Sequence, residues 1–140
     1  MRLRLPSSPA RPLLHRLLAA GLSTADPYHA LLKHVSLTRH SLRVGRRTYN
    51  LSHIDRIVVV GAGKASARMA QALETALGPR LDDGLVIVKT GHTLATKRIT
   101  ILEASHPIPD RAGLHATQRL LRLTQCLTPR DLLIVLLSGG

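Results

Sequence analysis

A short glycine-rich turn that ends in a lysine is the part of the sequence best suited to chemistry. Gly61-Ala62-Gly63-Lys64 follows the β-branched run 57–60 and leads into residues that repeat at helical spacing. A turn between a buried strand and a helix directs backbone N–H groups and the positive end of the helix dipole toward one point, and glycines let an anion approach the backbone. The turn therefore predicts a phosphate-binding or other anion-binding site.

Lys64 is the leading functional residue of this turn because of its position. We expect the helix to begin at Lys64. A lysine in the first helical turn adds positive charge where the helix dipole already disfavours it, so the placement is unfavourable unless an anion compensates. The plain alternative is a side chain that extends into solvent.

Three further loops follow predicted strands and are candidates for binding. Ser138-Gly139-Gly140 follows the apolar run 132–137 and is typical of the start of a second phosphate-binding loop. His92 and His106 lie in loops where an imidazole could contact substrate or phosphate, although each could equally be an ordinary surface histidine. The sequence shows no pair of ligands at a metal-binding spacing and no Gly-x-Ser-x-Gly nucleophile turn, so we predict no protein metal site.

The glycine turn departs from two known nucleotide-binding motifs. A P-loop needs a glycine five positions before the Gly-Lys pair and a hydroxyl residue after it, but Val58 and Ala65 stand there. The dinucleotide fingerprint needs a third small residue where Ser66 stands and an acid after the second strand, where the sequence has Lys89. A phosphate site remains compatible with the turn, whereas NAD binding does not follow.

The elements that must position these loops alternate between buried strands and helices. Apolar runs predict strands over 57–60, 85–88, 99–102 and 132–137, and helical spacing predicts helices over 64–77 and 112–127. This order predicts an α/β protein with a Rossmann-like, mainly parallel sheet flanked by helices. Ligands of such sheets bind beyond the carboxyl ends of the strands, where the candidate loops lie.

The N-terminal part of the chain predicts smaller elements ahead of the sheet. Residues 1–12 contain three prolines and predict a disordered arm, followed by a leucine-rich surface helix over 13–22. Asp26 is a suitable N-cap for a second short helix that carries Val35 on its apolar side, and the pattern over 41–51 predicts a small hairpin.

Composition narrows the class of protein. A hydrophobic content of 44% argues for a folded protein, and a net charge of +12 would attract polyanions. Only 1% of the residues are aromatic and no recognition-helix pattern appears, so nucleic acid is a disfavoured partner. No window is apolar enough for a membrane span, and the single Cys126 is predicted to be a small buried hydrophobe. We expect a cytoplasmic protein, with mitochondrial import of the Arg-rich N-terminus as the less favoured alternative.

Four segments together resemble the N-terminal domain of the class II glycerate kinases. They are Val58 to Ala65, Lys89-Thr90-Gly91-His92, Ala104 to Asp110 and Leu136 to Gly140, and they match the family in order and spacing. The resemblance spans about residues 13–140, and four separate loop motifs are far more specific than one glycine pattern. It implies a Rossmann-like domain that faces a separate C-terminal domain across the active-site cleft.

The resemblance also implies an activity and roles for individual residues. Family members transfer the γ-phosphate of ATP to the 2-hydroxyl of D-glycerate with Mg²⁺, which gives 2-phosphoglycerate and ADP. Lys64 matches the lysine with a catalytic role in the family. The other positions expected near substrate or phosphate are Gly61, Gly63, His106, Ser138, Gly139 and Gly140.

Two alternative functions remain open, and the sequence departs from the kinase family in one respect. Relatives of these kinases have been named hydroxypyruvate reductases, and a basic nucleic-acid-binding module without catalysis is the second alternative. In the family the glycines at 139–140 continue into a longer loop and a second domain. We therefore expect a truncated chain that is inactive alone, and a homo-oligomer is one option that the sequence leaves open.

Overall fold

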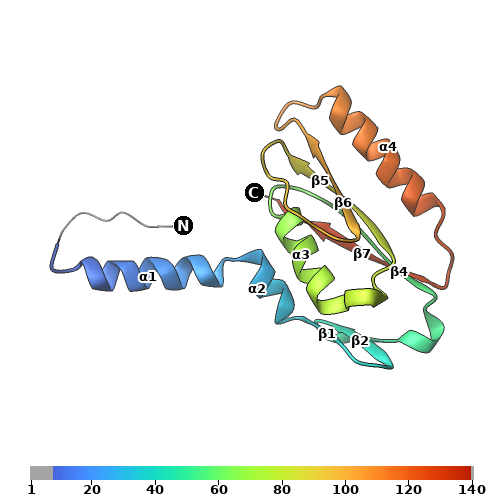
Figure 1. Ribbon diagram of the computed structural model, residues 1–140, viewed down its shortest axis with the longest axis horizontal. Helices are drawn as coiled ribbons and strands as arrows, with labels where there is room; N and C mark the ends of the chain where they lie inside the picture. The colour runs from blue at the N-terminus through green and yellow to red at the C-terminus, as the bar shows by residue number, and fades with distance from the viewer. Residues whose placement is uncertain (1–7, 140) are drawn as a thin grey trace.

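A four-stranded parallel sheet forms the centre of the molecule. The computed structural model describes residues 8–139. Helices α3 and α4 connect β4 to β5 and β6 to β7 and cover opposite faces of the sheet (Figure 1). The predicted α/β class and mainly parallel order are therefore confirmed. The sheet has the order β6-β5-β4-β7 and is built from β4 (Arg56–Ala62), β5 (Asp83–Lys89), β6 (Ile99–Ala104), β7 (Asp131–Leu137), α3 (Ser66–Leu77) and α4 (Arg111–Gln125), with a short 3-10 turn, η2 (Gly78–Arg80), after α3.

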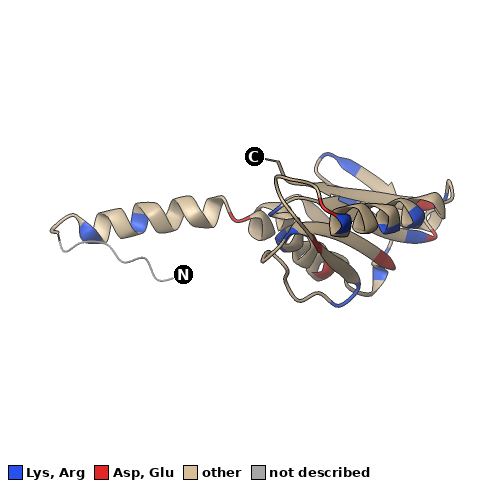
Figure 2. Ribbon diagram, turned by 90° about the horizontal axis from the view of Figure 1, so that it is seen from above, with Lys and Arg blue, Asp and Glu red and all other residues tan. Residues whose placement is uncertain are grey.

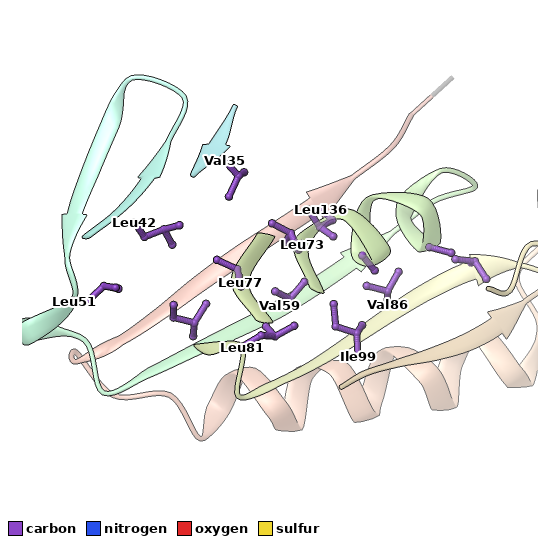
Figure 3. Close-up of a cluster of buried hydrophobic side chains, with 14 residues drawn as sticks. Val35, Leu42, Leu51, Val59, Leu73, Leu77, Leu81, Val86, Ile99 and Leu136 are labelled. Atoms are coloured by element: carbon purple, nitrogen blue, oxygen red, sulfur yellow. The ribbon is translucent and has the colours of Figure 1, made fainter. Parts of the chain in front are cut away.

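The main hydrophobic core lies between the sheet and α3. Val59 and Val86 face α3 from two neighbouring strands, and Leu73 and Leu77 of the helix are almost completely buried against them (Figure 3). Alternate strand residues point to opposite faces, so the next positions, such as Ile87, face the α4 side instead. Burial of each such aliphatic side chain contributes about 1.5–3 kcal/mol, which makes this layer the main stabiliser of the site's scaffold.

The connection from β5 to β6 crosses the α3 side of the sheet as a loop without a helix. Glu74 of α3 ties the end of this loop, because its carboxylate accepts from the backbone N–H groups of residues 97–99 at 2.6–2.9 Å. Gln71 Nε2 donates to the carbonyl of Ala95 at 2.8 Å. Burial acts to raise the pKa of Glu74, but these N–H bonds and Lys97 outweigh it and hold the pKa below its ordinary value.

Two helices and a second, antiparallel sheet precede the parallel sheet. The hairpin predicted over 41–51 is confirmed, but it belongs to a sheet of three strands in the order β1-β2-β3. Val35, predicted to lie on the second helix, is instead the first residue of β1, because that helix ends at Leu32. The elements are α1 (Arg11–Thr24), α2 (Pro27–Leu32), β1 (Val35–Leu37), β2 (Ser41–Val44), β3 (Arg47–Asn50) and the 3-10 turn η1 (Leu51–His53).

Helix α1 extends away from the body of the molecule (Figure 1). It begins at Arg11, inside the arm predicted over residues 1–12, and residues 1–7 lie outside the described part of the chain. None of its residues is buried, and Leu13 and Leu17 are 58% and 60% exposed. Figure 2 shows basic positions spread along α1 at one end of the molecule and along α4 at the other.

Helix α4 covers the other face of the sheet with a narrow apolar stripe. Ala116 is its one fully buried residue, while Leu114 and Leu121 are more than half exposed. Cys126, predicted to be buried, is exposed because the helix ends at Gln125 and the chain then turns away. Between residues 8 and 139, no helix is long and apolar enough to cross a membrane.

Candidate anion-binding site

The two glycine turns contact each other at one edge of the parallel sheet. β4 and β7 are neighbours with Ala62 opposite Leu137, so both strands end at the same edge. The Ser138 amide donates to the Ala62 carbonyl at 3.1 Å. Gly63 has a φ of +118°, and a Cβ at this position would lie 2.2 Å from the carbonyl oxygen of Ser138. Glycine is therefore required here by both backbone conformation and space.

Gly61 serves the packing of the same two strands. It is buried inside β4 and is absent from the lining of the cavity described below. A Cβ at Gly61 would lie 2.5 Å from the carbonyl oxygen of Leu136, so the glycine allows β7 to approach closely. The structure thus gives Gly61 a structural task, one step behind the turn where the sequence analysis expected a ligand contact.

Backbone amides of the first turn are mostly engaged within the protein. The Gly63 amide donates to the Ile87 carbonyl at 3.0 Å, and the Ser66 amide donates to the Gly63 carbonyl at 3.1 Å. The Ala65 amide donates to Ser138 Oγ at 3.0 Å, so Ser138 caps the start of α3. Among the described residues the Lys64 amide has no acceptor. An anion at this turn must therefore be held largely by side chains.

The helix begins later than the sequence predicts. α3 starts at Ser66, and Lys64 lies in the preceding turn with an exposed side chain. The predicted placement of Lys64 in the first helical turn is therefore wrong. Because Lys64 lies before the helix, the helix dipole disfavours its positive charge less strongly than the prediction assumed. Lys64 instead lines a cavity beyond the strand ends.

A cavity of about 370 Å³ opens at this edge of the sheet. Two lysines, one histidine and two serines line it, and no carboxylate does. None of the ion pairs found in the described residues involves Lys64 or Lys89. The cavity is therefore a region of uncompensated positive charge, which favours small anions. Its lining consists of Ala62, Gly63, Lys64, Ala65, Ile87, Val88, Lys89, Ala104, Ser105, His106, Ser138 and Gly139.

Most of the predicted site residues meet at this cavity. Lys64, Gly63, His106, Ser138 and Gly139 all line it, although they come from three separate loops. They meet because parallel neighbouring strands bring their carboxyl ends to one edge.

Two candidates from the sequence lie away from the cavity lining, and a third is not described. Gly61 packs behind the turn, as described above, and Gly140 lies outside the described residues. His92 is absent from the lining, and its Nδ1 lies 3.3 Å from the carbonyl oxygen of Thr90.

Two polar residues that line the cavity, Lys89 and Ser105, were not candidates from the sequence. Lys89 entered only as the residue that breaks the dinucleotide fingerprint, and Ser105 only as part of a longer motif. A signal for Lys89 was present, since it directly follows the apolar run 85–88 and must lie at the same edge as Lys64.

The residues around the cavity do not fit a protein-held Mg²⁺ ion. Magnesium in proteins is bound by carboxylate oxygens together with substrate phosphates and water. The cavity lining contains no carboxylate, and the described residues contain no cluster of three His, Cys, Asp or Glu side chains that could hold a metal.

The fold and the cavity define a Rossmann-like α/β protein with a lysine-lined cavity at the carboxyl edge of its sheet. The chain belongs to the family described as "Domain of unknown function (DUF4147)", whose model matches residues 13–140. It is 39% identical over 132 residues to an Agrobacterium vitis protein named as a hydroxypyruvate reductase, and the match covers 94% of this chain and 27% of the relative. It is 31% identical over 125 residues to a glycerate 2-kinase of Pyrococcus horikoshii, and that match covers 89% of this chain and 28% of the relative.

A solved structure shares the fold. A crystal structure of a Pyrococcus horikoshii protein matches 97% of this chain and 30% of its own length, with a TM-score of 0.82 and 29% identity. The chain therefore spans less than a third of the length of each of these relatives.

Proposed function

We propose that this chain forms an anion-binding part of a glycerate 2-kinase, which transfers the γ-phosphoryl group of ATP to the 2-hydroxyl of D-glycerate. The observation that carries the proposal is the cavity at the carboxyl edge of the sheet, lined by Lys64 and Lys89 and by no carboxylate. Both substrates and both products are anions, which such a site attracts. The name of the Pyrococcus horikoshii relative supports kinase chemistry.

The reaction asks the protein to position charge rather than to form a covalent intermediate. The 2-hydroxyl oxygen of D-glycerate attacks the γ-phosphorus, and the bond from that phosphorus to the oxygen bridging the β and γ phosphates breaks. ADP leaves with the bridging oxygen, and the hydroxyl proton is released. Charge on the transferring group is stabilised by fixed cations. Lys64 is the catalytic residue in this proposal, because it lines the cavity at the glycine turn.

Hydride transfer is the competing activity, because the Agrobacterium vitis relative is named as a reductase. A nicotinamide dinucleotide is usually held by an acidic residue after the second strand, which binds the ribose hydroxyls. In this chain the residue at the end of β5 is Lys89, and it lines the cavity. The geometry therefore favours phosphoryl transfer over a dinucleotide reaction.

Steady-state kinetics on the product of the complete open reading frame test the proposal. We expect ADP release that depends on D-glycerate. Lys64→Met should lower kcat by about 100- to 1,000-fold, the usual effect of removing one group that stabilises the transition state. Lys33→Met is the matched control, since Lys33 is an exposed lysine at the end of α2.

The far-UV circular dichroism spectra of the wild type, Lys64→Met and Lys33→Met should be the same, because neither substitution is expected to change the fold. Absence of glycerate-dependent ADP release would contradict the proposal. Oxidation of NADH by hydroxypyruvate would support the reductase instead.

A further inference from the structure

Lys89 lies on a rigid part of the cavity wall. It is the last residue of β5 and pairs with Ala104 of the neighbouring strand. The turn that follows is held by backbone bonds, in which the Thr90 amide donates to the Ala104 carbonyl and the His92 amide donates to the Lys89 carbonyl, each at 3.0 Å. Because the backbone on both sides of Lys89 is fixed, its side chain starts from a defined point beside the cavity.

Lys89 lies at the strand end where the cavity opens. Val86 and Val88 of β5 belong to the core beneath α3, so Ile87 and Lys89 alternate to the opposite face. Ile87, Val88 and Lys89 all line the cavity, which therefore spans the end of the strand, and Lys89 is half-buried. Ala104, the register partner of Lys89, also lines the cavity.

No protein carboxylate neutralises this lysine. Glu103 is the acidic residue nearest in the pairing register, but its carboxylate accepts from the Gly91 amide at 2.8 Å. Glu103 itself is not among the residues that line the cavity. Within residues 8–139, Lys89 forms neither an ion pair nor a side-chain hydrogen bond. Two lysines on one small cavity repel each other unless an anion lies between them.

We propose that Lys89 binds the carboxylate of the acid substrate, while Lys64 meets the phosphoryl group. This inference rests on the proposed kinase function and assigns the specificity for an acid to one residue. The product carries a carboxylate and a phosphate on the same carbon, so it offers two anionic groups to two cations. Lys64 borders the glycine turn, and Lys89 borders the cavity from β5 beside Ser105 and His106.

Comparison of two acceptors tests this role in the product of the complete open reading frame. D-glycerate carries the carboxylate, and glycerol has a third hydroxyl-bearing carbon in its place. We expect Lys89→Met to raise the KM for D-glycerate by about 10- to 100-fold, the value of one charge-assisted hydrogen bond. The KM for ATP should stay within about twofold because the phosphate contacts are retained. The preference for D-glycerate over glycerol in kcat/KM should fall by the same factor, which a merely structural role would not cause.

Further variants separate the outcomes. Lys89→Gln repeats the test if the methionine variant is poorly folded, and Lys89→Arg should restore part of the preference for the acid because it keeps the charge. Lys33→Met should leave both KM values unchanged. If the wild type is active and Lys89→Met retains its KM and its preference, the role of Lys89 is refuted while the kinase function stands. An inactive wild type would overturn the kinase function and this role together.

Discussion

Gly63→Ala tests the contact between the two glycine turns, on which the cavity depends. The added Cβ would lie 2.2 Å from the Ser138 carbonyl oxygen and 2.3 Å from its Oγ, whereas ordinary contacts begin at 3.4 Å. The end of β7 must therefore move by about 1.2 Å. That movement strains the bond from the Ala65 amide to Ser138 Oγ, which is worth about 1 kcal/mol. The φ of +118° adds about 1–3 kcal/mol for a residue with a Cβ.

We therefore expect Gly63→Ala to destabilise the chain by about 2–4 kcal/mol. Gly45→Ala is the matched control, because Gly45 also has a positive φ, +59°, but a Cβ there meets nothing within 4 Å. It should cost only about 1–2 kcal/mol.

Urea unfolding followed by far-UV circular dichroism measures both free energies of unfolding, since the chain has no tryptophan for fluorescence. A Gly63→Ala variant no less stable than Gly45→Ala would refute the close contact of the turns.

Two further substitutions test the bonds that hold the loops. Glu74→Gln should lower the free energy of unfolding by about 1–2 kcal/mol at pH 7, since the amides of 97–99 lose a charged acceptor. The pKa of Glu74 is lowered in the folded state, so the carboxylate stabilises the fold above the ordinary carboxyl pKa and loses this effect as the pH falls through the folded-state pKa. Urea unfolding at a series of pH values from about 7 down to about 3 should therefore show the stability difference between wild type and Glu74→Gln shrinking. Ser138→Ala should cost about 1 kcal/mol because it uncaps the Ala65 amide. Ser105→Ala, on the same cavity but without a hydrogen bond among the described residues, should have little effect on the same measurement.

The sheet could be predicted because runs of apolar residues mark its strands. The run Ile57 to Val60 is continuous and apolar because β4 is a central strand that is buried on both faces. The run Leu132 to Leu137 also marks a strand, although β7 is an edge strand and Leu137 is 71% exposed. Val35 could not be placed correctly, because a strand of three residues is too short to show a period of two. Its burial comes from packing against distant parts of the chain, which local spacing does not report.

The location of the candidate site could be predicted from the sequence, but the roles of its individual residues could not all be predicted. The rule that ligands bind at the carboxyl ends of parallel strands brings Lys64, His106 and Ser138 to one cavity. Sequence spacing could not separate a glycine that admits a ligand from one that admits a neighbouring backbone, which is the case of Gly61. It also could not show that the hydroxyl of Ser138 is already used as a helix cap, since that bond joins residues 73 positions apart.

A crystal structure of the complete protein with D-glycerate and a nonhydrolysable ATP analogue would test the central assignment most directly. We expect the glycerate carboxylate about 3 Å from Lys89 Nζ, and the γ-phosphate at a similar distance from Lys64 Nζ. Binding of both ligands away from the edge formed by Gly63 and Ser138 would contradict it.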